Sequence, residues 1–203
     1  MTTEAIAALS ALVGADGAVL LPITAIEIGG HNAVPDAMAE LLADRLKWRL
    51  SLGDIVQVNK VGHTKALAFN RIVTPAAFEG PVIRGANYVL VDDHVGLGGT
   101  LANLKGHVET NGGIVVAMTT LTESRQARHI ALRSDVLGVL KAEHGDELEN
   151  LWRDHFGHGL EQLTNVEGEN LRREHTVDAI RNRLAQAEVE VRERGIAVGK
   201  EPP

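Results

Sequence analysis

The chain has 203 residues, a formal net charge of −7 and no cysteine; its length suffices for one domain with a sizeable core plus an appendage. The negative charge argues against general nucleic-acid binding, which needs a cationic surface to displace counterions. The lack of cysteine excludes a disulfide framework and thiolate chemistry and fits a reducing cytoplasm.

Neither a secretory signal nor a membrane span is expected. No Lys or Arg occurs before Arg45, whereas a signal peptide needs a positive segment ahead of its apolar stretch. No apolar run approaches the roughly 20 residues that span a bilayer. We therefore expect a cytoplasmic protein without membrane contact.

The N-terminal part of the chain predicts helix, strand, helix, strand. Residues 4–13 carry apolar side chains at helical spacing. Residues 19–28 form an apolar, β-prone run that Pro22 interrupts, and a helix with Pro35 in its first turn follows. Residues 55–60 alternate between apolar and polar side chains, as a strand does.

The middle of the chain predicts the centre of a parallel sheet. Residues 63–74 are compatible with a hairpin arm or a loop, and residues 78–81 have a turn signature. Residues 88–91 are wholly apolar, as expected for a strand buried on both faces. A helix over residues 101–111 and a strand over residues 114–121 follow. This alternation indicates an α/β fold, a parallel sheet flanked by helices.

The C-terminal third has a different pattern, with charged helical stretches and no further strand. Thr164 and Glu167 have the spacing of a capping box at a helix start. Residues 176–194 predict an amphipathic helix whose apolar side chains form one stripe.

We therefore divide the chain into an α/β core, residues 1–122, and a helical C-terminal extension, residues 123–203. The apolar stripe over residues 177–191 can be buried against a second copy of the chain, so we expect a homodimer.

The segment most informative about function runs from Tyr88 to Thr100 (YVLVDDHVGLGGT). A strand ends in two acids, Asp92 and Asp93, and a glycine-rich loop then enters a helix. Ligands of open parallel sheets bind beyond the carboxyl ends of the strands, where loop amides and a helix N-terminus form an anion cradle. The acids repel that anion but accept hydrogen bonds from sugar hydroxyls. The segment therefore predicts a phosphorylated sugar as ligand.

This segment resembles the phosphoribosyl pyrophosphate (PRPP) motif of type I phosphoribosyltransferases, with the match running from about residue 15 to residue 122. The resemblance implies a type I phosphoribosyltransferase-like core. It implies that Asp92 and Asp93 are catalytic and hold the ribose 2- and 3-hydroxyls. It also implies that the 5-phosphate is bound by Val95, Gly96, Leu97, Gly98, Gly99 and Thr100.

A second segment resembles the pyrophosphate loop of that family, which follows an early strand. Ile28 stands where the family often has a cation, and Glu27 adds a negative charge. A plain strand-to-helix turn is an equal alternative. The residues implied by the resemblance are Ile28, Gly29, Gly30 and His31.

Cationic residues after the third predicted strand resemble the family's mobile hood and can neutralise a pyrophosphate leaving group. A solvated hairpin is the alternative. The residues are Lys60, Lys65 and Arg71.

Together the segments predict Mg²⁺-dependent transfer of phosphoribosyl from PRPP to a nitrogenous base, with release of pyrophosphate. Mg²⁺ is expected to bind through the ligand rather than through direct protein ligands. The alternative is a non-catalytic regulatory protein that binds PRPP or a nucleotide monophosphate. Ile28 in the pyrophosphate loop and Leu97 in the phosphate loop favour this alternative, because each replaces a residue that would contact the ligand. Nothing in the sequence names the acceptor base.

Overall fold

The structure, a computed structural model, describes residues 1–27, 30–59, 68–124 and 129–196. Its contacts divide the chain into two compact units. The sheet unit comprises residues 1–60, 76–95 and 100–123, and the helical unit comprises residues 61–75, 96–99 and 124–203. The helical unit thus contains the C-terminal third of the chain and two short segments from its middle.

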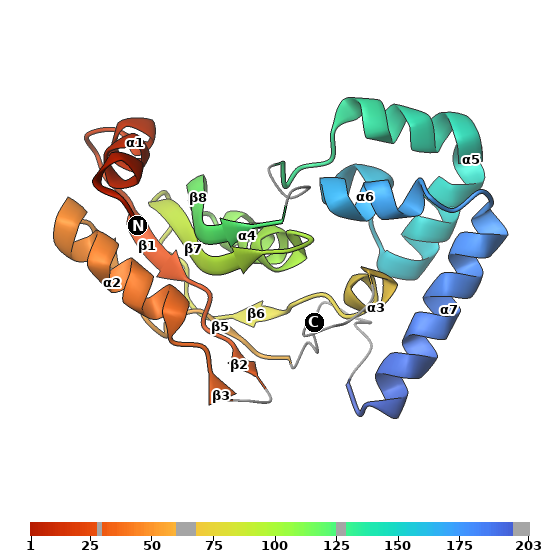
Figure 1. Cartoon of the computed structure of the whole chain (residues 1–203), viewed down its shortest axis with the longest axis horizontal. Coiled ribbons are helices and arrows are strands. Elements are labelled where there is room, and N and C mark those ends of the chain that lie inside the picture. The colour runs from red at the N-terminus through yellow and green to blue at the C-terminus, as the bar shows by residue number, and fades with distance from the viewer. Residues whose placement is uncertain (28–29, 60–67, 125–128, 197–203) are drawn as a thin grey trace. The chain divides into compact units, whose positions relative to one another are not determined.

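The sheet unit contains a four-stranded parallel sheet with strand order β4-β1-β7-β8; Figure 1 labels β1, β7 and β8. Every residue of β1 is buried, as expected for a central parallel strand covered on both faces. The strands are β1 (Val19–Pro22), β4 (Arg49–Leu50), β7 (Asn87–Val95) and β8 (Ile114–Glu123).

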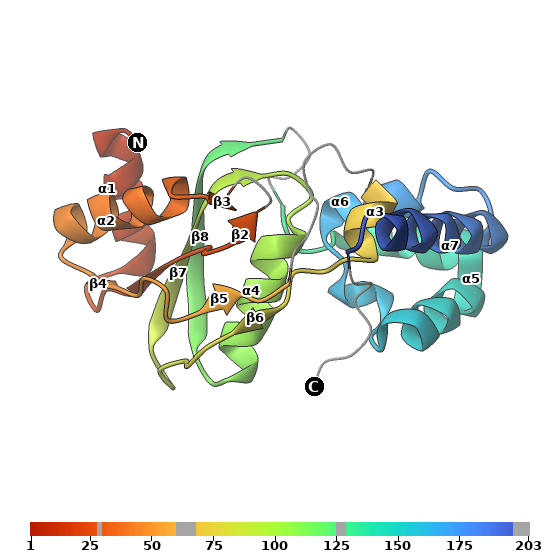
Figure 2. The same cartoon turned by 90° about the horizontal axis from the view of Figure 1, so that it is seen from below.

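Helices cover both faces of this sheet. Helices α1 (Thr3–Val13) and α2 (Val34–Leu46) lie on one side, and α4 (Gly99–Thr110) lies on the other (Figure 2). The core between the sheet and the first two helices includes Leu20 and Val89. The predicted α/β class, a parallel sheet flanked by helices and followed by C-terminal helices, is confirmed.

The strands depart from the prediction in their extent. Strand β7 does not stop at Val91 but continues through both acids to Val95, because the long edge strand β8 supplies backbone partners along that whole length. The run over residues 19–28 splits into β1 and β2 (Ile26–Glu27), and β2 pairs with β3 (Gly30–His31).

The segment between α2 and β7 also differs from the prediction. Of the described residues 55–59 only β5 (Val56–Gln57) is a strand, and its antiparallel partner is β6 (Phe78–Glu79), where a turn was expected. Residues 68–72 form the short helix α3 (Ala68–Ile72) instead of a hairpin arm or loop.

The helical unit has its own apolar core, which includes Trp152 at 1% exposure. Its elements are α3, α5 (Ser134–Phe156), the 3-10 helix η1 (Leu160–Gln162), α6 (Asn165–Leu171) and α7 (Val177–Glu193). The predicted stripe on α7 is buried in this core through Val177, Ile180, Leu184 and Val191. The hypothesis that this stripe packs against a second copy is therefore wrong, because α3 and α5 of the same chain cover it; a homodimer stays a prediction.

Both predicted helix starts in this unit are capped by threonine. The Thr164 hydroxyl accepts from the Glu167 amide at 3.3 Å, and the Glu167 carboxylate accepts from the Thr164 amide at 2.8 Å. This completes the expected capping box. At α7, the Thr176 hydroxyl accepts from the amide of Ala179 at 3.1 Å.

Removing the exposed cap of α7 should lower stability measurably. We expect Thr176→Ala to reduce the free energy of unfolding by about 1 kcal/mol, because the Ala179 amide loses its acceptor. Thr176→Ser keeps the hydroxyl and should remain close to wild type. Urea unfolding followed by circular dichroism measures both variants, and equal losses would show that the cap does not stabilise the helix.

Candidate functional site

The glycine-rich segment connects β7 directly to α4. The strand ends at Val95 and the helix begins at Gly99, so only residues 96–98 lie between them. Gly98 has φ +87°, a left-handed conformation that favours glycine. Because β7 is parallel to its neighbour β1, this loop lies beyond the carboxyl end of the central strands, where open α/β sheets bind ligands.

The two acids belong to the last part of β7. Asp92 is 9% exposed and Asp93 is half-buried. Successive side chains of a strand leave on opposite faces, and the Asp93 amide donates to Asp92 Oδ1 at 2.8 Å. The two carboxylates therefore leave β7 on opposite faces, two and three residues before the strand ends at Val95.

Asn32 connects the early glycine segment to the acid pair. Its Nδ2 donates to Asp93 Oδ2 at 3.0 Å, across 61 positions of sequence. Its own Oδ1 accepts from the amide of Val34 at the start of α2. Neither contact was predicted from the sequence, although a glycine turn after an early strand was predicted. The residue that follows β3 thus meets the last part of β7 within the sheet unit.

Residues 96–99 of this loop belong to the helical unit and contact other residues of that unit. A Cβ built at Gly96 lies 2.7 Å from Nη1 of Arg71, so the guanidinium lies directly against the loop backbone. Ser124 Oγ donates to the Gly96 carbonyl at 2.9 Å. Burial lowers the pKa of Arg71 from its ordinary value, but an arginine remains charged at neutral pH. A permanent cation therefore lies beside the predicted phosphate loop.

Glu167 lies at the other end of the same loop. A Cβ built at Gly99 lies 3.1 Å from its Oε1, while its Oε2 accepts from the Thr164 amide. Burial raises the pKa of Glu167 above its ordinary value; the hydrogen bonds with Thr164 and the charge of His158 oppose that rise. The sequence identified Glu167 as a capping residue only, and no local signal pointed to its contact with the loop.

The raised pKa of Glu167 predicts a specific pH dependence of stability. Between the ordinary pKa and the higher folded value, the folded state binds more protons than the unfolded state, so the free energy of unfolding falls as pH rises. Glu167→Gln keeps the capping acceptor and should lack this decline. Urea unfolding of both proteins from pH 4 to pH 8 measures the difference. Parallel pH profiles would contradict the prediction.

The other predicted site residues lie in strands, in the loop, in α4 or outside the described part of the chain. Val95 is the buried last residue of β7, and Leu97 and Thr100 are half-buried. In the proposed pyrophosphate loop, Gly30 and His31 form strand β3. The remaining residues, Ile28, Gly29, Lys60 and Lys65, lie outside the described part of the chain.

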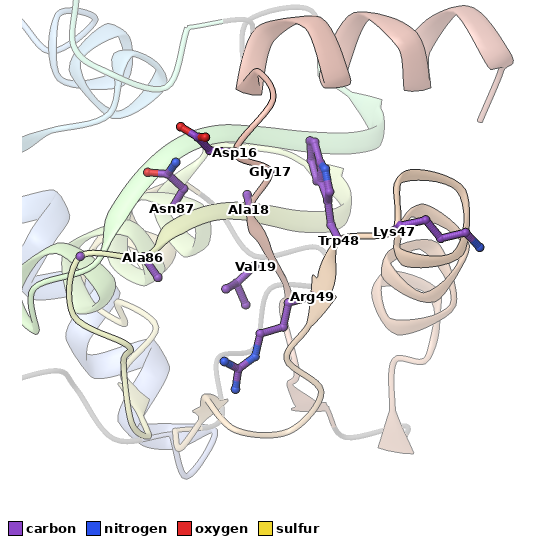
Figure 3. Close-up of a pocket in the computed structure, with 10 residues that line it drawn as sticks. Asp16, Gly17, Ala18, Val19, Lys47, Trp48, Arg49, Ala86 and Asn87 are labelled. Carbon is purple, nitrogen blue, oxygen red and sulfur yellow. The ribbon is translucent and has the colours of Figure 1, made fainter.

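A shallow pocket of about 390 Å³ lies at the opposite end of the sheet (Figure 3). It is formed at the amino ends of β1, β4 and β7, where Trp48 lies over Gly17 and Asp16 lies near Asn87. None of the predicted site residues lines it. Because ligands of parallel sheets bind at the carboxyl ends of the strands, we place the candidate site at the loop and not in this pocket.

The fold and the loop together define an α/β protein with a parallel sheet, a glycine-rich strand-to-helix loop and C-terminal helices. The chain is 38% identical over 187 residues to Protein TraN of Escherichia coli, covering 92% of this chain and 42% of the relative. It is also 38% identical over 108 residues to an uncharacterized protein of Haemophilus influenzae, covering 53% of this chain and 24% of that protein. The chain therefore spans less than half the length of either relative.

Among solved structures, adenine phosphoribosyltransferase from Thermoanaerobacter pseudethanolicus is similar to the chain, with a TM-score of 0.38 and 24% identity. The match covers 59% of this chain and 64% of that chain. This likeness is too distant to assign a fold, which rests here on the sheet itself. No family model matches the chain. Among the described residues, no helix has both the length and the apolar character that crossing a membrane requires.

Proposed function

We propose that this chain binds PRPP at Asp92–Thr100 and, with Mg²⁺, transfers the phosphoribosyl group to a nitrogenous base. One observation carries the proposal: β7 passes through two acids, turns over three residues and enters α4, all at the carboxyl end of a parallel sheet. The loop amides and the first turn of α4 favour a phosphate, while carboxylates favour hydroxyl donors. A phosphorylated sugar satisfies both requirements at once.

Each part of the ligand has a matching group in the protein. The 5-phosphate lies on the amides of the loop, with the Arg71 guanidinium beside Gly96 as counter-charge. The ribose hydroxyls donate to Asp92 and Asp93, and Asn32 holds the second carboxylate in place. This assigns Arg71 to the 5-phosphate and not to the pyrophosphate that was expected from the sequence.

The transfer exchanges one bond at ribose C1 for another. The bond from C1 to the pyrophosphate oxygen breaks, and its electron pair leaves with pyrophosphate. A nitrogen lone pair of the base forms the new C1–N bond, and that nitrogen loses a proton to solvent. The carboxylates of Asp92 and Asp93 stabilise the positive charge that develops on the ribose ring.

The residues at the strand end fit magnesium bound through the ligand. Mg²⁺ is usually held by one or two carboxylates together with substrate phosphates and waters. Since Asp92 and Asp93 accept from the ribose hydroxyls in the proposed complex, Mg²⁺ would bind through oxygens of the ligand. Magnesium would supply charge neutralisation on the pyrophosphate.

A second candidate function is binding of PRPP or a nucleotide monophosphate without catalysis. The position of Arg71 favours it, because the side chain lies against the loop backbone at Gly96, and this cation was expected to neutralise a pyrophosphate leaving group. A regulatory protein needs the loop that binds the phosphate but no cation for a leaving group.

Calorimetry separates these candidates. PRPP with Mg²⁺ is titrated first, then nucleoside 5-monophosphates, and pyrophosphate release is measured with a panel of bases. Binding of PRPP with pyrophosphate release supports the transferase. Binding without release supports the regulatory protein. Absence of binding by every phosphorylated ligand overturns both.

A further inference from the structure

A histidine follows the acid pair in the last part of β7. His94 is exposed, and its Nδ1 lies 2.8 Å from Oγ1 of Thr122 on the neighbouring strand β8. The two residues are partners in the parallel register of these strands, and both belong to the sheet unit. This contact fixes the imidazole ring at the carboxyl end of the sheet, next to the acids that are expected to hold the ribose.

The Thr122 hydroxyl determines which nitrogen of this ring carries the hydrogen. Its Oγ1 also lies 3.2 Å from the carbonyl oxygen of Asp93, which can only accept. A hydroxyl has a single hydrogen to donate, so both contacts are hydrogen bonds only if Thr122 donates to the carbonyl and accepts from His94 Nδ1. In the neutral ring Nε2 then has a free lone pair, and it forms no hydrogen bond with the described residues.

This free nitrogen lies on the same side of the strand as one of the acids. Side chains two residues apart on a strand share a face, so Asp92 and His94 leave β7 in the same direction, about 7 Å apart along the strand. In the proposed complex Asp92 accepts from a ribose hydroxyl, which is carried by the carbon next to C1 or by the one after it. The base that attacks C1 is therefore separated from Asp92 by a distance comparable with that between Asp92 and His94.

We propose that Nε2 of His94 accepts the proton that the attacking base loses, and that Thr122 positions the ring for this step. The inference rests on the proposed function, because it needs the transfer at ribose C1. The nitrogen lone pair forms the C1–N bond, and pyrophosphate leaves with the electron pair of the broken C1–O bond. The N–H bond of the base gives its proton to Nε2, and its electrons stay on the nitrogen. The imidazolium then releases the proton to solvent.

A proton acceptor at this position also restricts the class of the base. A neutral purine or pyrimidine attacks through a ring system that must lose an N–H hydrogen when the new bond forms. A pyridine nitrogen carries no hydrogen and needs no proton acceptor. His94 therefore favours a purine or pyrimidine over a pyridine as the acceptor of the phosphoribosyl group.

Nitrogen-15 NMR of the histidine rings tests the hydrogen-bond arrangement without any ligand. At pH 8, where imidazole rings are ordinarily neutral, the ring whose signals are lost in His94→Ala should carry its hydrogen on Nδ1. Thr122→Val removes the hydroxyl and should shift the hydrogen at least partly to Nε2, whereas Thr122→Ser keeps the hydroxyl and should resemble wild type. A wild-type ring with its hydrogen on Nε2 would overturn the inference.

Pyrophosphate release from PRPP and Mg²⁺ tests the catalytic role, with adenine, hypoxanthine, uracil and nicotinate as acceptors. We expect wild type to use a purine or pyrimidine, and His94→Ala to lose about 100-fold or more in kcat/KM while it binds PRPP as wild type does in calorimetry. Added imidazole should restore part of the loss, because position 94 is exposed. His175→Ala, at an exposed histidine of the helical unit, is the matched control and should keep wild-type activity with no response to imidazole.

The outcomes separate this inference from the proposed function. If wild type transfers phosphoribosyl and His94→Ala does so equally well, the transferase stands and the role of His94 is wrong. The same conclusion follows if imidazole restores nothing, or if nicotinate is the only acceptor used. If wild type releases no pyrophosphate with any of these bases, the transferase is wrong and the inference fails with it.

Discussion

Replacing Gly80 by alanine is expected to lower the free energy of unfolding by about 3 kcal/mol or more. Gly80 follows β6 with φ +136°, a conformation that side chains rarely adopt. A Cβ there would lie 2.0 Å from the carbonyl oxygen of Asp54 and 2.8 Å from Cα of Ile55. Both are backbone atoms, and Ile55 is 1% exposed, so neither can move without disturbing the β5–β6 pair and the core beside it.

A matched glycine in the same unit provides the control. Gly106 lies exposed in α4, and a Cβ built there meets nothing within 4 Å. Because alanine is the better helix former, Gly106→Ala should raise stability by about 0.5–1 kcal/mol. Urea unfolding of both variants gives the comparison. Equal stability of Gly80→Ala and wild type would show that the backbone at Asp54 and Ile55 moves away from Gly80 more easily than the structure indicates.

The elements that depend only on nearby residues were predicted correctly from the sequence. The capping box at Thr164, the amphipathic helix over residues 176–194 and the apolar strand at residues 88–91 all follow from spacing or composition within one element, and all were found. The extension of that strand through Asp92 and Asp93 was missed, because its cause is the backbone of β8. The short helix α3 was missed because five residues without a recognised capping pattern give little helical signal.

The contacts that define the candidate site come from distant parts of the sequence. The glycine-rich loop and the acid pair were identified from their order alone. Arg71 was expected as a cation near the pyrophosphate, but its contact with Gly96 was not predicted, and neither were the contacts of Asn32 and Glu167, because folding brings these separate elements together. Hydrophobic patterning reports which face of an element is buried but not which polar residue that face will meet. The partners of a loop were therefore beyond prediction from one sequence.

The largest effect on binding is expected from removing both acid charges. The variant Asp92→Asn with Asp93→Asn should weaken PRPP binding about 30- to 100-fold, because two charge-assisted hydrogen bonds become neutral ones and each loses about 1–1.5 kcal/mol. The fold should survive. Asparagine at position 93 keeps an acceptor for Asn32, and asparagine at position 92 keeps one for the amide of residue 93.

The control for this variant must change the charge of the sheet unit equally without touching the loop. Asp16→Asn with Asp44→Asn does so, since Asp16 lines the pocket at the amino ends of the strands and Asp44 pairs with Lys47 on the surface. Calorimetry with PRPP and Mg²⁺ should then find wild-type affinity in the control and a loss only in the acid-pair variant. If the acid-pair variant keeps its affinity while remaining folded, the sugar does not bind at the end of β7. Equal losses in the two variants would mean that net charge, and not a hydrogen-bonded ribose, accounts for the binding.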